Sequence, residues 1–240
     1  MSLNLMKCWE IFVQNMDMFF YGIRVTLLYA IVGTIVGFLI GLILGGIRGL
    51  EINESDSALV KGLKRAGHLI TGCYVWVFRG TPMMVQAMFF YYFLKDLIGW
   101  NMATAGMFII SINTGAYMAE IIRSGLQSVD KGQTEAAKSI GMSTAQTLRY
   151  IIFPQAIRNA FPSIGNQLIV NIKDSCMLNV LSVTDLFFQS QSIAGSNLLF
   201  METFFVTAIL YLILTTVATF ILNQIEKRLN MDSSYHDYCA

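Results

Sequence analysis

Arg79 interrupts an apolar part of the chain, and a guanidinium in that setting could bind an anionic group. The residues after it are Gly80, Thr81 and Pro82, and apolar residues flank the four on both sides. In a membrane, a charged side chain and irregular backbone occur mainly where they line a cavity or are buried in protein. Facing a cavity, Arg79 could hold a carboxylate through two parallel hydrogen bonds. It could equally be structural, pairing with an acid or with carbonyl groups freed by Pro82.

A second polar group lies within a later apolar segment. Asn113, Tyr117 and Glu120 recur at spacings of four and three, so they share one face of a helix. That face is predicted to point into a helix bundle. For Asn113 and Thr114, hydrogen bonding between helices is the commoner role in membranes, and contact with a substrate is the alternative. Glu120 is predicted to pair with Arg123 near the cytoplasmic end of the segment.

The segment 161–181 carries more polarity than a lipid-facing helix accepts. Gln167, Asn171 and Asp174 are spaced by four and three and therefore form one polar stripe. The stripe is predicted to face the protein interior. Asp174 and its neighbour Lys173 are interpreted as a buried or interfacial ion pair, with a coupling-ion site as the alternative.

Long apolar helices must position these residues. Hydrophobic residues make up 55% of the chain and charged residues 13%, which indicates an integral membrane protein. Since a span needs about 20 apolar residues, the sequence predicts an all-α fold with about five transmembrane helices in one domain, 1–240. The predicted spans are 19–47, 66–94 with a break at 79–82, 102–122, 161–181 and 199–222. In the first of these, four glycines at every fourth position predict close packing of another helix: Gly33, Gly37, Gly41 and Gly45.

The distribution of Lys and Arg orients the spans. Two loops are rich in them, with Arg48, Lys61, Lys64 and Arg65 in the first and Arg123, Lys131, Lys138, Arg149 and Arg158 in the second, the 123–158 loop. Because cytoplasmic loops are enriched in these residues, both loops are predicted to be cytoplasmic. The N-terminus is therefore predicted outside and the C-terminus inside. The segment 1–18 has no predicted role.

The 123–158 loop is predicted to contain two short helices. In the first, Thr134 could be the N-terminal cap and Gly141 the left-handed stop. In the second, Ser143 and Gln146 fit a capping box, and Pro154 is predicted to end the helix. Such a knob is either an ordinary helical hairpin or a surface for a partner protein.

The residues give no support for an enzyme, a cofactor site or a metal site. The four cysteines are not at metal-ligand spacing, the two histidines offer no base for a catalytic triad, and no phosphate-binding loop is present. If ATP drives this protein, another chain must hydrolyse it. A passive channel or an ion-coupled secondary carrier is the alternative, although neither a repeated ring of acids nor an inverted repeat is apparent.

Two motifs carry a resemblance to a known family. They are Arg79-Gly80-Thr81-Pro82 and a segment in which Glu135-Ala136-Ala137 is followed by Gly141 and then by Ile151 and Phe153-Pro154. Together they resemble the polar amino acid (His/Glu/Gln/Arg/opine) group of ABC-importer permeases, whose EAA motif usually has Leu where Phe153 stands. Further matching stretches are Gly22 to Leu27, Asn113 to Tyr117, Ala119 to Gly125, Gly165 to Gln167 and Lys173 to Ser175.

The resemblance implies the type I importer permease fold in a bacterial plasma (inner) membrane. It implies two cytoplasmic ATPases, which would bind the ATP and magnesium, a second identical or similar permease, and an extracytoplasmic binding protein that delivers a polar amino acid. Glu135, Ala136, Ala137 and Gly141 would dock an ATPase, and Pro82, Pro154 and Asp174 would be structural. The hypothesis for substrate binding is that Arg79 holds the α-carboxylate, while the amine or side chain lies near Asn113, Thr114, Gln167 and Asn171.

Overall fold

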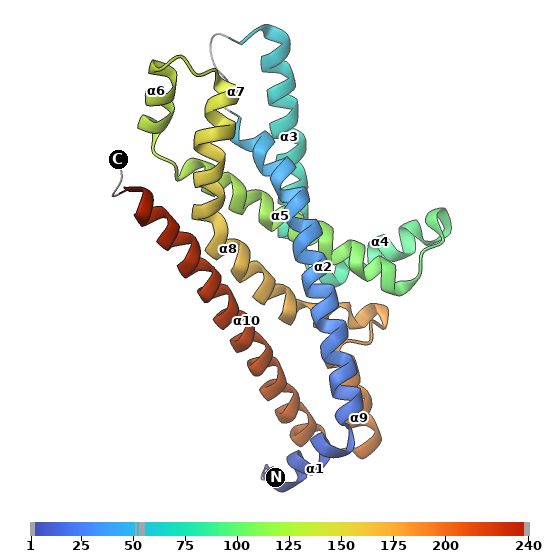
Figure 1. The fold of residues 1–240 in the computed structure, drawn as a ribbon. Helices are drawn as coiled ribbons and strands as arrows, with labels where there is room; N and C mark the ends of the chain where they lie inside the picture. Colours follow the sequence, from blue (N-terminus) through green and yellow to red (C-terminus); the bar gives the residue numbers. More distant parts are fainter. Residues whose placement is uncertain (1–2, 51, 53–55, 238–240) are drawn as a thin grey trace. The chain divides into compact units, whose positions relative to one another are not determined.

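The computed structural model describes residues 3–50, 52 and 56–237, and the regular structure in this part of the chain is helical (Figure 1). Its α-helices are α1 (Leu5–Gln14), α2 (Met16–Gly49), α3 (Ala58–Gly80), α4 (Met83–Ile98), α5 (Met102–Gln127), α6 (Lys131–Ser139), α7 (Thr144–Thr147), α8 (Phe153–Asp174), α9 (Leu186–Asn197) and α10 (Phe200–Asp237). Two short segments are wound differently, the π-helix η1 (Leu148–Ile152) and the 3₁₀-helix η2 (Ser175–Leu181). The predicted all-α fold class is confirmed.

The helices divide between two compact units. Unit 1 comprises Met1–Ile35, Thr81–Ser111 and Leu168–Ile221, and unit 2 comprises Val36–Gly80, Ile112–Gln167 and Leu222–Ala240. The residue ranges of α2, α5, α8 and α10 each extend into both units. The packing within each unit is therefore described separately.

Among the described residues, three helical segments are long and apolar enough to span a membrane: α2, α5 and Phe200–Leu229 of α10. They correspond to the first, third and fifth predicted spans. The second predicted span, 66–94, falls within α3 and α4, and the chain between these helices is Thr81 and Pro82. Pro82 has the extended backbone of a non-helical residue, with ψ 135°, and its ring leaves no backbone donor. The predicted break at this proline is confirmed.

The core of unit 1 joins helices from both ends of the sequence. Its buried cluster contains residues of α1, α2, α9 and α10, namely Cys8, Ile11, Phe19, Leu186, Ile193 and Val206. The backbones of α2 and α9 approach closely, because a Cβ on Gly22 would lie 2.7 Å from the Cα of Leu186. At the same place Thr26 Oγ1 accepts a hydrogen bond of 3.1 Å from the Leu186 backbone N–H. Glycine at position 22 is thus required by the packing.

Asp185 organises the start of α9 in unit 1. It is fully buried, and its Oδ1 accepts a hydrogen bond of 3.0 Å from the Phe188 backbone N–H. Its Oδ2 accepts hydrogen bonds from the hydroxyl groups of Ser175, at 3.2 Å, and Tyr211, at 3.4 Å. One carboxylate therefore caps a helix and connects it to η2 and α10.

We expect Asp185→Ala to lower the free energy of unfolding by about 2–4 kcal/mol, since one helix cap and two buried hydroxyl partners are lost together. Asp185→Asn should cost less, because its amide oxygen can still accept from Phe188. Thermal unfolding of the purified protein in detergent measures both. An alanine variant as stable as the unmodified protein would contradict this role of Asp185.

The four glycines at every fourth position of α2, called the glycine ridge below, pack closely against another helix as predicted, namely α5. In unit 1, a Cβ on Gly33 would lie 3.0 Å from the side chain of Ile110. In unit 2, a Cβ on Gly37 would lie 2.6 Å from Thr114, and one on Gly41 would lie 2.3 Å from Met118. Real Cβ atoms do not approach other atoms so closely, so the two helices can pack in this way only because these positions lack a side chain. The prediction of a packing role is confirmed.

The 123–158 loop forms the expected short helices in unit 2, but one cap differs. α6 begins after Asp130, whose side chain accepts a hydrogen bond of 2.7 Å from the Gly132 backbone N–H. Thr134 lies inside α6, so its prediction as the cap was wrong: Asp130 is the non-helical residue whose side chain accepts from the first turn. Gly141 has φ +83°, which confirms the left-handed stop. The capping box of Ser143 and Gln146 is also confirmed.

Pro154 does not end a helix, contrary to the prediction. The chain stays helical from α7 through η1 into α8, and Pro154 is the second residue of α8. In η1 the backbone N–H of Phe153 bonds to the carbonyl of Leu148, five residues earlier. This wider winding lies directly before the proline and shifts the backbone bonding pattern at the point where Pro154 offers no donor, so the helix continues past it. Pro162, at the start of the predicted span 161–181, also lies inside α8, which begins at Phe153.

Candidate functional site

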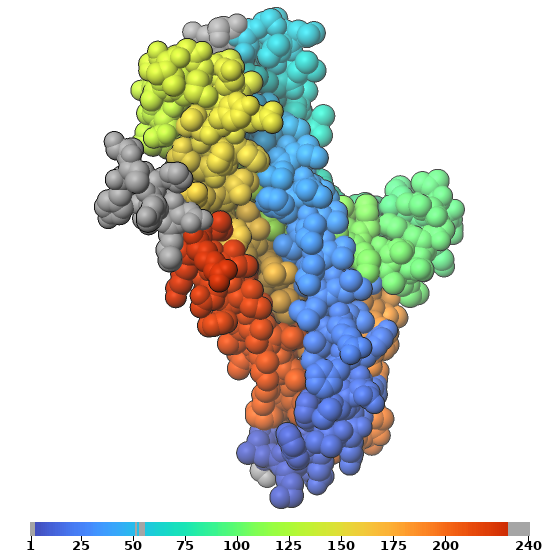
Figure 2. Space-filling view, in the orientation of Figure 1, coloured from blue at the N-terminus to red at the C-terminus, as the bar shows by residue number. Residues whose placement is uncertain are grey.

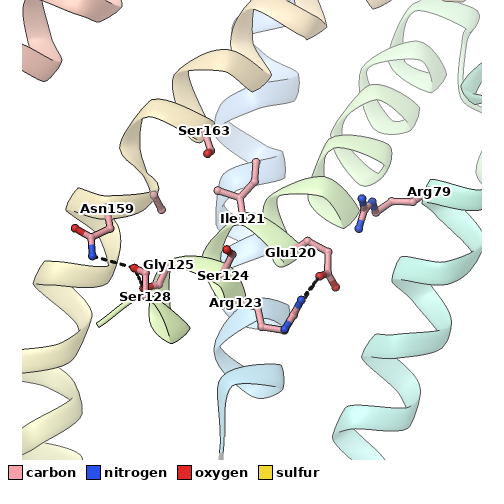
Figure 3. A pocket seen from close by; sticks show the side chains of 10 residues that line it. Arg79, Glu120, Ile121, Arg123, Ser124, Gly125, Ser128, Asn159 and Ser163 are labelled. Carbon is pink, nitrogen blue, oxygen red and sulfur yellow. Dashed lines mark hydrogen bonds and ion pairs between the residues drawn. The ribbon is translucent and has the colours of Figure 1, made fainter. Parts of the chain in front are cut away.

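Unit 2 contains a pocket of about 470 Å³ between side chains of α3, α5 and α8 (Figure 3). Its lining is polar and positively charged, and it consists of Arg79, Glu120, Ile121, Arg123, Ser124, Gly125, Ser128, Asn159, Ala160 and Ser163. A pocket of this size with a few convergent polar groups can hold a small polar molecule.

Arg79 is the predicted substrate residue that the structure places in this pocket. It is the penultimate residue of α3, and its guanidinium carbon lies 5.2 Å from the ring centroid of Tyr117. Arg79 takes part in none of the three ion pairs among the described residues. Figure 3 shows its side chain extending from α3 toward Glu120 on α5. The Tyr117 ring face supports the cation without satisfying its hydrogen-bond donors, so the guanidinium could accept an anionic partner.

Glu120 is held between two arginines. Its Oε2 accepts a hydrogen bond of 2.7 Å from Arg123, which confirms the predicted pair. Its Oε1 is bonded to Arg48 at the end of α2, a partner that the sequence did not predict. Two guanidinium groups compensate this one carboxylate, which leaves the positive charge of Arg79 unbalanced at the pocket. The local field therefore favours a negatively charged group beside Arg79.

The wall formed by α5 and α8 was missed from the sequence. Asn159 donates a hydrogen bond of 2.9 Å to the hydroxyl of Ser128, and this bond ties the two helices together. Ser128 directly follows α5 and lies four residues after Ser124, and Asn159 and Ser163 are four residues apart on α8. This spacing places each pair on one helix face, so it was a usable signal.

The other predicted substrate residues do not line the pocket. Asn113 is buried in unit 2 and donates a hydrogen bond of 3.2 Å to the Phe78 carbonyl. Thr114 is buried against Gly37, and Gln167 is also buried. Asn171 belongs to unit 1 and donates a hydrogen bond of 2.8 Å to Thr34 Oγ1. These hydrogen bonds of Asn113 and Asn171 are of the helix-bridging kind expected in membranes.

Among the described residues, the structure forms one predicted helix face but not the ion pair predicted for Lys173 and Asp174. Asn113, Tyr117 and Glu120 do share a face, since the first two contact Phe78 and Arg79 of α3 and the third lines the same pocket as Arg79. Lys173 and Asp174 form none of the ion pairs among the described residues, so their prediction as a pair was wrong. Adjacent helical residues point about 100° apart, and the Lys173 side chain is exposed.

The EAA segment forms an exposed surface on α6. Glu135 and Ala136 are exposed, whereas Ala137 is buried and anchors the helix. Ile140 projects from the end of α6 as one of the most exposed large apolar side chains, directly before the turn at Gly141. An exposed acidic residue and an exposed large apolar one on the same short segment suit a protein partner better than water.

Comparison with known proteins identifies the family. Residues 57–231 match the family described as binding-protein-dependent transport system inner membrane component. The glutamine transport system permease protein GlnP of Escherichia coli K12 is 40% identical over 161 residues, covering 66% of this chain and 74% of that protein. A putative glutamine transport system permease protein of Rickettsia felis is 33% identical over 210 residues, 87% of this chain and 91% of that protein. The arginine transport system permease protein ArtQ of Bacillus subtilis is 33% identical over 162 residues, 67% of this chain and 74% of that protein.

Solved structures give the same result. The crystal structure of an amino acid ABC transporter with histidines superimposes with a TM-score of 0.80 at 33% identity, over 95% of this chain and 100% of that chain. The inward-facing MetNI methionine ABC transporter matches with a TM-score of 0.73 at 19% identity, over 89% and 97% of the two chains, and this match shows the fold alone. The chain belongs to the family of binding-protein-dependent transport system inner membrane components, the permease subunits of ABC importers.

Proposed function

We propose that this permease subunit imports a polar amino acid of the glutamine and arginine type. The observation that carries the proposal is the Arg79 guanidinium, which lies in a positively charged pocket without an acidic partner among the described residues. Every α-amino acid offers a carboxylate to such a group. The relatives named for glutamine and arginine support the same substrate class.

The remaining substrate contacts are proposed for a different state of the transport cycle. Asn113, Thr114, Gln167 and Asn171 are buried in this structure. Alternating access requires helices to move relative to one another, and such movement could present buried amide and hydroxyl groups to the amine or side chain of the substrate. Arg79 is the group proposed to hold the α-carboxylate here.

The proposed assembly contains two permeases, identical or similar, two cytoplasmic ATPases and an extracytoplasmic binding protein. ATP and magnesium would bind to the ATPases, because this chain has no phosphate-binding loop. The charge distribution of the loops supports an outside N-terminus and a cytoplasmic C-terminus. Closure of the ATPases would push on α6 and bias the permeases between inward-open and outward-open states. Family membership favours this mechanism over a passive channel or a secondary carrier.

We expect Glu135→Lys to release the ATPase from the permease. The substitution reverses the charge of an exposed side chain on α6 while leaving Ala137 and Gly141 in place. A reversed charge in a protein interface adds repulsion where there was attraction. The measurement is the amount of ATPase that co-purifies with a tagged permease from gently solubilised membranes, with an expected loss of about tenfold.

Glu10→Lys is the matched control, since it makes the same charge change on an exposed position of α1. It should retain the ATPase. Full retention of the ATPase by the Glu135→Lys variant would remove α6 from the docking surface. If no ATPase accompanied the unmodified chain in several mild detergents, the proposal of an ATP-driven importer would itself be overturned.

A further inference from the structure

The side chains of α1 fall into three sectors around the helix, and the first sector faces the protein. Cys8 and Ile11 are buried in the core of unit 1, and Phe12 packs against that core. Successive residues of an α-helix are rotated by about 100°, which places these three on one side of α1. This side attaches the helix to unit 1.

The second sector is apolar and exposed. Leu5 and Trp9 are each 66% exposed, Met6 is 73% exposed and Val13 is 46% exposed. The same rotation places these four next to one another, beside the core-facing side. Two adjacent apolar sides on a ten-residue helix are more than packing onto one core requires. Exposed apolar side chains gathered on one face usually mark a contact with lipid or protein.

The third sector is polar. Lys7, Glu10 and Gln14 are exposed and line a pocket of about 400 Å³ within unit 1. The pocket also includes Ile11, at the edge of the core-facing side, and Asn15, Ser196, Asn197 and Leu199. The polar side of α1 therefore faces an open, hydrophilic hollow.

The joint between α1 and the first span holds the three sectors in place. Both the backbone N–H and the side-chain amide of Asn15 bond to the Ile11 carbonyl, at 3.1 and 2.9 Å. The Phe19 backbone N–H then bonds to the Asn15 carbonyl at 3.1 Å, so α2 starts directly after the turn. The first turns of α2 expose Phe20 and Tyr21. Figure 2 shows α1, at the dark blue start of the chain, on the surface of the molecule.

We propose that α1 lies in the lipid–water interface of the membrane, with Leu5, Met6, Trp9 and Val13 in the lipid and with Lys7, Glu10 and Gln14 in water. A helix of this kind buries its apolar face about 5–10 Å into the boundary between headgroups and acyl chains. Trp is enriched at that depth because its ring is apolar and its N–H is polar. The position of α1 immediately before a span places it at this boundary, and the exposed aromatic residues that follow, Phe20 and Tyr21, lie in the first turns of that span.

The role of such a helix is to hold the outer end of α2 at a set depth. The hydrogen bonds of Asn15 fix α1 relative to the start of α2. The buried cluster that α1 shares with α9 and α10 fixes it relative to those helices. The orientation proposed above puts this helix on the extracytoplasmic side. The interfacial location itself does not depend on that orientation.

Quenching of Trp9 fluorescence by brominated lipids tests the proposal. The chain has three tryptophans, so the complete transporter is reconstituted in nanodiscs with Trp76→Phe and Trp100→Phe, which leaves Trp9 as the only one in this chain. Tryptophans of the partner chains are subtracted with the matching Trp9→Phe sample. Bromine near the headgroups should lower the Trp9 emission by roughly half, and bromine deep in the acyl chains should lower it less.

Gln14→Trp in a Trp9→Phe background is the matched control on the polar sector. Its emission should respond to iodide in the buffer and not to brominated lipid. The proposal is overturned if Trp9 responds to iodide alone, which would place that face in water. It is also overturned if Trp9 responds to neither quencher, which would place it against a partner protein. If the Trp76→Phe, Trp100→Phe variant does not assemble, Trp9 is followed instead as the difference in emission between the unmodified transporter and Trp9→Phe. Quenching of this difference by brominated lipid and by iodide is then measured in the same way.

Discussion

Replacing Arg79 with alanine is expected to reduce uptake at limiting substrate at least about tenfold, because a charge-assisted, bidentate hydrogen-bond pair is lost. The guanidinium lies in the unit 2 pocket beside the Tyr117 ring and has no acidic partner among the described residues. Removing it leaves Glu120 with its two arginines, so the ion pairs of the pocket should survive. ATP-driven uptake of radiolabelled glutamine or arginine into proteoliposomes measures the loss.

Two variants separate substrate binding from general damage. Arg79→Lys keeps the charge but not the planar fork of the guanidinium. Its uptake should therefore fall between that of the unmodified protein and that of Arg79→Ala. Arg65→Ala removes an exposed arginine from the same helix and should transport normally. The Arg79 assignment fails if Arg79→Ala transports normally at limiting substrate when equal amounts of protein are inserted. The importer function would stand in that case, with the carboxylate bound elsewhere.

Gly41→Val is expected to destabilise the permease by about 3 kcal/mol or more, since the added side chain has no space. The first added carbon alone would lie 2.3 Å from Met118 Cβ and 3.0 Å from the Ala119 backbone nitrogen. The backbone atoms cannot move aside as a flexible side chain would. α2 and α5 would have to separate in unit 2, and the packing along Gly37 and Gly45 would loosen with them. The melting temperature and the folded yield in detergent measure the effect.

Gly46→Val is the matched control on the same helix. A Cβ on Gly46 would meet no atom within 4 Å, so this variant should be as stable as the unmodified protein. Valine is also a somewhat better helix former than glycine, which removes propensity as an explanation for any loss at position 41. Equal stability of the two variants would show that the close approach at Gly41 contributes little.

Local chemistry explains the predictions that the structure confirms. Pro82 lacks a backbone donor, Gly141 adopts a left-handed conformation, and Ser143 with Gln146 makes a capping box. Each of these effects depends on a few consecutive residues, and the sequence therefore predicts it wherever the helices pack. Thr134 failed as a cap because α6 begins earlier, after Asp130, and the point at which the backbone enters a helix does not follow from the cap residue type alone.

Residues far apart in the chain account for most of what the sequence missed. Arg48 and Glu120 are bonded across 72 positions, and Ser128 and Asn159 across 31. A spacing pattern identifies the face of a helix, but it does not identify the residues on the opposite helix. For the same reason the sequence grouped Asn113, Thr114, Gln167 and Asn171 with Arg79, whereas the helix packing buries the four and leaves Arg79 in the pocket.

The sequence by itself determined the membrane class, the helical fold, the break after Arg79 and the turn of the EAA segment. These depend on composition and on short stretches of backbone, whose energetics are local. The tertiary structure decided which helix meets the glycine ridge, which cations hold Glu120, and how η1 carries the helix past Pro154. It also decided that the helix α1 has separate core-facing, apolar and polar sides. Such features are set by the contacts between distant segments, and those contacts exist only once the chain has folded.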